Sequence, residues 1–94
     1  MYNLEIKEEA DRIFGKLARK NFKQLEIIDN KIKKIRIDPD HNYKFLHPPL
    51  KSFNRVHIDN SFVLIFKINH VTRTVIIYYF AHHDDVYKWR PKPE

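Results

Sequence analysis

The chain contains six histidines and no cysteine, so imidazoles, carboxylates and basic groups are its main reactive side chains. Two adjacent histidines and two aspartates form the stretch His82–Asp85, which follows an apolar run. A second stretch, Arg55–His57, alternates polar and apolar residues. Because strand side chains alternate between faces, Arg55 and His57 are expected on the face opposite Val56. These two stretches are the candidates for a reactive site.

A metal site is one reading of His82–Asp85. Adjacent residues of an extended segment point to opposite faces, so His82 and His83 are not expected to bind one ion. The chain also lacks the His-x₃-His and cysteine-rich spacings that are typical of zinc sites. We therefore predict no metal ion and no cofactor. His82, Asp84 and Asp85 are expected to shape the turn or to orient His83.

Acid–base cleavage of RNA is the better candidate, because the 2′-hydroxyl is a nucleophile within the substrate. The reaction requires a base for that hydroxyl, an acid for the departing 5′-oxygen and positive charge near the phosphate. Histidine suits the first two roles near neutral pH, and arginine, lysine or protonated histidine suits the third. His57, His83 and Arg55 would meet these needs on one open, concave face with His83 at its rim. The competing reading is a polar sheet edge whose histidines have no catalytic role. His41 and His70 lie in loop and turn contexts, and they are expected to be solvated and without partners.

The balance of charges indicates a polyanionic partner. Eighteen Lys and Arg residues exceed twelve Asp and Glu residues, which gives a net charge of +6, and 14% of the residues are aromatic. Basic surfaces attract nucleic acid through counterion release, and exposed aromatic rings stack on bases. Tyr87, in a short polar tail, is a candidate for such stacking. The single glycine excludes a glycine-rich phosphate-binding loop.

Ninety-four residues are expected to form a single domain, 1–94. The sequence shows no secretory signal and no apolar stretch of membrane-spanning length. Together with the lack of cysteine, this predicts a cytoplasmic protein.

The apolar periodicity predicts an α+β fold with the element order β-α-α-β-β-β. A helical hairpin packs on one face of a small, mostly antiparallel sheet, and the last strand is central because it is nearly all apolar. Pro48 and Pro49 place a loop between the helices and the later strands. The expected strands are 4–7, 53–58, 61–68 and 74–80, and the expected helices begin near 8 and 22, the second ending before Pro39.

The order of elements and several short motifs resemble the RelE/ParE toxin superfamily of toxin–antitoxin systems. The resemblance covers essentially the whole chain and starts with the strand and the basic amphipathic helical hairpin. The segment HPPLKSFNRVHIDNSFVLIFKI is similar to the strand pair of the family, with Leu50-Lys51-Ser52 as a Leu-Lys-Gly-like lead-in. The stretch HHDDVY is similar to the closing His-Arg-x-x-Val-Tyr signature. Within the superfamily the chain is most similar to the histidine-rich YafQ-type branch.

The resemblance implies a ribosome-dependent messenger-RNA endonuclease that is silenced by a cognate antitoxin. Val63 and His83 stand where many RelE-type toxins carry arginines, so a histidine-centred mechanism is expected. In it, His57 and His83 are base and acid in either order, while Arg55 and His47 supply charge and Tyr87 stacks on a base. The residues that this implies to be catalytic are His57, His83, Tyr87, Arg55 and His47, and those that it implies to contact RNA are Phe62, Trp89 and Lys51.

Two other functions remain open at this level. A ParE-like toxin shares the fold but binds gyrase and cleaves no RNA, and it does not need the histidine set. An inactive family member would retain only antitoxin binding. The messenger RNA on the ribosome and the antitoxin are the expected partners, with no membrane and no small-molecule cofactor.

Overall fold

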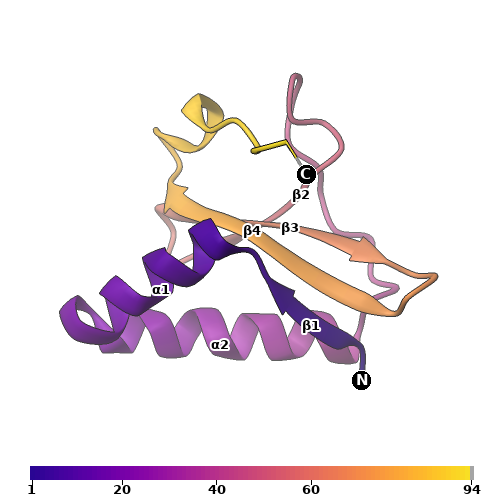
Figure 1. The fold of residues 1–94 in the computed structure, drawn as a ribbon, viewed down its shortest axis with the longest axis horizontal. Helices are drawn as coiled ribbons and strands as arrows, with labels where there is room; N and C mark the ends of the chain where they lie inside the picture. The colour runs from indigo at the N-terminus through magenta and orange to yellow at the C-terminus, as the bar shows by residue number, and fades with distance from the viewer. Residues whose placement is uncertain (94) are drawn as a thin grey trace.

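The computed structural model describes residues 1–93, and its order of strands and helices is the predicted one (Figure 1). The last strand runs two residues further than expected, to His82. The elements are β1 (Asn3–Ile6), α1 (Glu8–Lys20), α2 (Phe22–Ile37), β2 (Asn54–Ile58), β3 (Phe62–Asn69), β4 (Thr74–His82) and the short 3-10 helix η1 (Val86–Lys88).

The four strands form one mixed sheet in the order β1-β4-β3-β2. β3 pairs antiparallel with both β2 and β4, whereas β1 pairs parallel with β4. The mostly antiparallel sheet and the central place of β4 are therefore confirmed. Asp59 and Asn60, in the turn between β2 and β3, adopt φ values of 53° and 56°. Asp and Asn tolerate this left-handed conformation better than most residues, which explains the tight reversal.

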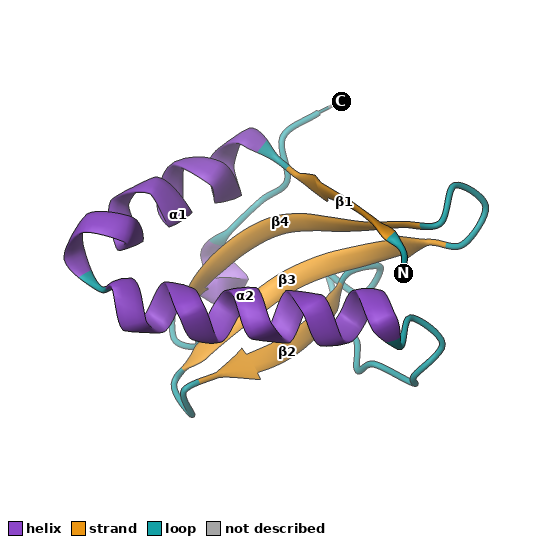
Figure 2. Cartoon of the chain, turned by 90° about the horizontal axis from the view of Figure 1, so that it is seen from below, coloured by secondary structure: helices purple, strands orange, loops and turns teal. Residues whose placement is uncertain are grey.

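The two helices cover one face of the sheet, as Figure 2 shows from below. The side chain of Asn21 accepts a hydrogen bond from the backbone N–H of Gln24 and so caps α2 where the chain leaves α1. Apolar side chains of both helices pack on the sheet, and the buried members of this first core are Ala10, Phe14, Ile28, Ile32, Ile35, Ile58, Leu64, Phe66, Val75, Ile77 and Phe80.

Within residues 1–93, no helix combines the length and apolarity that crossing a membrane would require.

A second core lies on the other face of the sheet. The loop before β2 and the C-terminal segment cover this face, opposite the helices (Figure 1). Both contribute buried residues, and the second core contains Leu46, Leu50, Phe53, Val63, Ile65, Val86 and Trp89. The sequence pattern indicated a covered face only for the helices. The second core matters for function because it holds two irregular segments in place.

Candidate functional site

A hollow of about 320 Å³ lies beside the second core, between β2, the loop before it and the segment after β4. Its apolar walls are Leu46, Val63 and Val86. The polar side chains that line it are His47, Arg55, His57, His83 and Tyr87. These are the five residues that were predicted to be catalytic. The expectation that Arg55 and His57 share an open face with His83 is therefore confirmed, while their chemical roles stay a prediction.

Strand β2 directs Arg55 and His57 into the hollow. His57 lies opposite Val63 of β3, and Ile58, the next residue, is fully buried in the first core. This alternation places His57 on the face away from the helices, where its side chain is exposed. The backbone N–H of Arg55 donates to the carbonyl of Lys44 at 2.9 Å, which holds the preceding loop against the start of β2.

The loop before β2 holds His47 at the hollow through its apolar neighbours. Leu46 and Leu50 are only 3% and 2% exposed. The backbone N–H of Leu46 donates to the carbonyl of Phe53 at 2.9 Å, and that of Leu50 donates to the carbonyl of His47 at 3.0 Å. Burial and these hydrogen bonds fix the backbone, so the exposed His47 side chain is carried by an ordered turn.

Tyr87 meets His47 across the hollow. The backbone N–H of His47 donates to the phenol oxygen of Tyr87 at 2.9 Å. The two rings are stacked, with centroids 6.0 Å apart and an interplanar angle of 21°. Val86, buried in the second core, anchors η1 and with it Tyr87. Tyr87 is 36% exposed, so part of the residue faces solvent.

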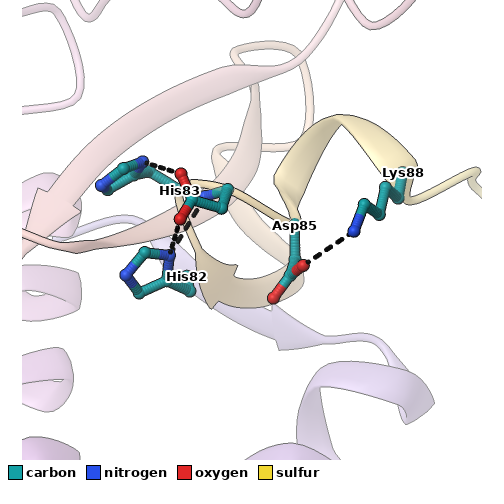
Figure 3. Close-up of polar contacts among 5 residues, drawn as sticks. His82, His83, Asp85 and Lys88 are labelled. Atoms are coloured by element: carbon teal, nitrogen blue, oxygen red, sulfur yellow. Dashed lines mark hydrogen bonds and ion pairs between the residues drawn. The ribbon is translucent and has the colours of Figure 1, made fainter.

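His83 is the first residue after β4, and it is held from two sides. Its backbone N–H donates to the carbonyl of Ser61 at 2.9 Å, which ties it to the turn between β2 and β3. Its Nδ1 lies 3.0 Å from Oδ1 of Asp84 (Figure 3). A protonated Nδ1 that donates to this carboxylate would leave Nε2 free to exchange a proton. The expectation that Asp84 contacts and orients His83 fits this geometry.

The expectation that His82 and His83 point to opposite faces is wrong. Their ring centroids are 4.4 Å apart, and Nδ1 of His82 lies 3.4 Å from Oδ2 of Asp84. The physical reason is that β4 ends at His82 and the chain turns over residues 83–85, so strand alternation no longer applies. His82, His83 and Asp84 could therefore hold a metal ion together.

Trp89, which was expected to contact RNA, packs in the second core and does not line the hollow. It is 7% exposed, and its ring stacks on Tyr79 at a centroid distance of 5.2 Å. Its indole N–H donates to Oε1 of Glu9 at 2.9 Å. Burial raises the pKa of Tyr79, and the carboxylates of Glu9 and Asp85 raise it further. Trp89 is thus a structural residue that ties the C-terminal segment to α1.

Phe62 and Lys51 also lie away from the hollow. Phe62 packs on the helix-covered face, where its ring stacks on Phe80 at 5.3 Å. This is the face opposite His57, because Phe62 lies opposite Ile58 in the sheet. Lys51 is exposed in the loop before β2 and does not line the hollow.

The two histidines that were expected to be solvated are exposed, but both have partners. Nδ1 of His70 lies 3.0 Å from the phenol oxygen of Tyr2, and the ring of His41 packs edge-on against Tyr43 at 4.8 Å. Neither residue lines the hollow.

Two archaeal proteins are similar to the chain over nearly its whole length. One, from Methanocaldococcus jannaschii and described as "Putative toxin RelE4", is 46% identical over 88 residues, which are 94% of this chain and 93% of that protein. The other, an uncharacterized protein from Methanosarcina mazei, is 48% identical over 87 residues, which are 93% of this chain and all of that protein. No protein-family model matches the chain.

Solved structures of bacterial toxins share the fold at low sequence identity. A metal-bound toxin from Helicobacter pylori has a TM-score of 0.76 and 18% identity, covering 92% of this chain and 99% of its own. Escherichia coli toxin RelE, as a mutant in the free state, has a TM-score of 0.71 and 17% identity. The match covers 93% of this chain and 90% of RelE. A chain of the toxin–antitoxin complex RelBE2 from Mycobacterium tuberculosis has a TM-score of 0.70 and 19% identity. The match covers 87% of this chain and 98% of that chain.

Proposed function

Because the chain belongs to the RelE/ParE superfamily of toxins from toxin–antitoxin systems, we propose that it cleaves messenger RNA on the ribosome by metal-independent acid–base catalysis. The observation that carries this proposal is the hollow itself. It gathers His57 from β2, His83 from the segment after β4, an arginine, a third histidine and a tyrosine around one space of about 320 Å³. An arrangement of this kind is what cleavage through the 2′-hydroxyl requires.

In the proposed reaction, one of His57 and His83 accepts the proton of the 2′-hydroxyl. The deprotonated 2′-oxygen attacks the adjacent phosphorus, and the bond from phosphorus to the 5′-oxygen breaks. The other histidine donates a proton to that departing oxygen. Positioned acids and bases each contribute about 10²–10⁴ in rate. Asp84 acts as a positioning residue, because its carboxylate lies at Nδ1 of His83. It favours the tautomer that is protonated at Nδ1, which leaves Nε2 free to exchange a proton.

Arg55 and His47 provide positive charge for the phosphate, which becomes more negative as the transition state forms. Arg55 is half-buried at the hollow, and a guanidinium there can hold two phosphate oxygens at once. Tyr87 offers the exposed part of its ring to an RNA base while its phenol oxygen stays bonded to the loop that carries His47. This histidine set supports a YafQ-type mechanism in place of one that uses lysine and arginine.

The expected regulator is a cognate antitoxin in the cytoplasm. RelBE2 of Mycobacterium tuberculosis and RelBE of Escherichia coli are toxin–antitoxin complexes of the same fold, which supports this partner. The net charge of +6 favours an acidic antitoxin segment, at least partly helical, that folds across the basic surface.

Inducing the chain alone and mapping messenger-RNA ends in the arrested cells tests this function. New ends inside translated coding regions, absent when translation initiation is blocked, are the expected result. Growth arrest with intact transcripts and inhibited gyrase would instead identify a ParE-like toxin. Normal growth at high expression would identify a member that only binds its antitoxin.

A further inference from the structure

Three side chains that can bind metal ions converge at the end of β4. Nδ1 of His83 lies 3.0 Å from Oδ1 of Asp84, and Nδ1 of His82 lies 3.4 Å from Oδ2 of the same carboxylate (Figure 3). One possible ligand atom from each of the three residues lies within 4.8 Å of the other two. Across residues 1–93, no other group of three His, Cys, Asp or Glu side chains meets this criterion.

The backbone brings the three side chains together. After β4 ends, the N–H of His83 donates to the carbonyl of Ser61 at 2.9 Å, and the N–H of Asp85 donates to the carbonyl of His82 at 2.9 Å. These bonds close the turn and fix both ends of the cluster. The edge of the His82 ring also contacts Phe62, with centroids 5.4 Å apart, which limits its rotation. The ligands are therefore close to one another before any ion arrives.

We propose that His82, His83 and Asp84 bind one divalent late-transition-metal ion such as Zn²⁺ or Cu²⁺, with water completing its coordination. Bonds of about 2.0–2.2 Å from imidazole nitrogen and carboxylate oxygen place neighbouring ligands about 3–3.5 Å apart. The two nitrogen–oxygen separations of 3.0 and 3.4 Å have this size. Two imidazoles select Zn²⁺ and Cu²⁺ over Mg²⁺ and Ca²⁺, which take oxygen ligands.

Binding exchanges existing contacts for bonds to the ion. The backbone N–H of Asp84 donates to Nδ1 of His82 at 3.1 Å, and this hydrogen bond is replaced when His82 binds. The site lies at the surface, where water can take up that N–H. The contact between His83 and Asp84 is likewise replaced by a shared ion, so that the two side chains remain near their present positions.

The site overlaps the hollow at a single residue, His83. Ion binding rests on no assumption about RNA, whereas its consequence for cleavage rests on the proposed function. An ion on Nδ1 of His83 displaces Asp84 as the partner of that nitrogen. The ion occupies the lone pair of Nδ1, so Nε2 carries the proton of the neutral ring and cannot accept another. With His83 as the base, a bound ion therefore inhibits cleavage, and the site is regulatory.

Calorimetric titration of the purified, metal-free chain with Zn²⁺, and separately with Cu²⁺, tests the site. The expected result is one ion per chain, with affinity reduced at least tenfold by His82→Ala and by Asp84→Asn. Asp84→Asn leaves the apolar contacts of the turn intact, so its result stands even where His82→Ala disturbs Phe62. His41→Ala, which removes an exposed histidine elsewhere, and His57→Gln should leave the affinity unchanged.

Unchanged affinity in both His82→Ala and Asp84→Asn would overturn the proposal. Loss of binding in His57→Gln would also overturn it, because the ion would then sit within the hollow between His57 and His83. The cleavage assay is separate. A chain that binds the ion as predicted but never cleaves RNA would refute the proposed function and leave the metal site standing.

Discussion

The backbone N–H of His47 donates a hydrogen bond of 2.9 Å to the phenol oxygen of Tyr87, forty positions later in the chain. This bond joins the loop before β2 to the segment after β4, neither of which is part of the sheet. The stacked rings of the two residues reinforce it. Two walls of the hollow therefore hold one another in place, and Tyr87 has both a structural contact and an exposed ring.

The two features of Tyr87 can be separated by substitution. Tyr87→Ala removes the ring, and we expect RNA affinity to fall about 10–100-fold, since stacking on one base contributes about 1–3 kcal/mol. Tyr87→Phe keeps the ring and removes only the acceptor for the N–H of His47, so its loss should be much smaller. Binding of both variants to a short single-stranded RNA measures this difference. Equal affinities for the wild type and Tyr87→Ala would contradict the stacking role.

Trp89 should affect stability and not RNA binding. Trp89→Ala removes a buried ring from the second core, and we expect the free energy of unfolding to fall by about 3–5 kcal/mol. Trp89→Phe fills part of the space but loses the hydrogen bond to Glu9, and its loss should be smaller. Urea denaturation followed by circular dichroism measures both changes. A Trp89→Ala chain of wild-type stability with weakened RNA binding would instead indicate that Trp89 contacts RNA.

The case of Trp89 illustrates what the sequence could not determine. The order of strands and helices and the face of β2 follow from local apolar periodicity, which is why Arg55 and His57 were placed correctly. Trp89 is buried in the second core and donates a hydrogen bond to Glu9, eighty positions away, and no local pattern encodes these contacts. β3 is apolar on both faces, with Val63 through Phe66 all buried, so alternation could not show which face Phe62 occupies.

The turn after β4 is a second feature that the sequence could not determine. Alternation was extended from β4 through His83, but the strand ends at His82, and element ends are the least certain part of a pattern-based prediction. That single residue decides whether two imidazoles lie apart or together. Residue chemistry and strand alternation singled out Arg55, His57 and His83, whereas the role of His47 came only from the family resemblance. The separation of His47 and Tyr87 along the chain gives no local sign that they meet.

Cleavage should not depend on a bound metal ion. We expect toxin that has been treated with EDTA, and then freed of the chelator, to cleave messenger RNA on magnesium-containing ribosomes at the untreated rate or faster. The physical reason is that imidazoles perform both proton transfers and Arg55 supplies the charge. The initial rate of cleavage measures the effect. Activity lost on this treatment and regained with Zn²⁺ would show that a metal ion takes part.

Antitoxin binding should weaken as the salt concentration rises. The net charge of +6 attracts an acidic partner through charges at the surface, and the screening length falls from about 10 Å at 0.1 M salt to about 3 Å at 1 M. Titrations of the antitoxin at several salt concentrations measure the dependence. An affinity that stays constant over this range would contradict the electrostatic part of the interaction.

The rate of messenger-RNA cleavage by His57→Gln and His83→Gln chains on purified ribosomes shows whether these two histidines transfer the protons. Glutamine retains size and hydrogen bonding but cannot transfer a proton at neutral pH. We expect each variant to fold, to bind the antitoxin and to cleave about 10²–10⁴ times more slowly than the wild type. His41→Gln and His70→Gln, outside the hollow, should cleave at the wild-type rate. Wild-type cleavage by both His57→Gln and His83→Gln would contradict the histidine mechanism.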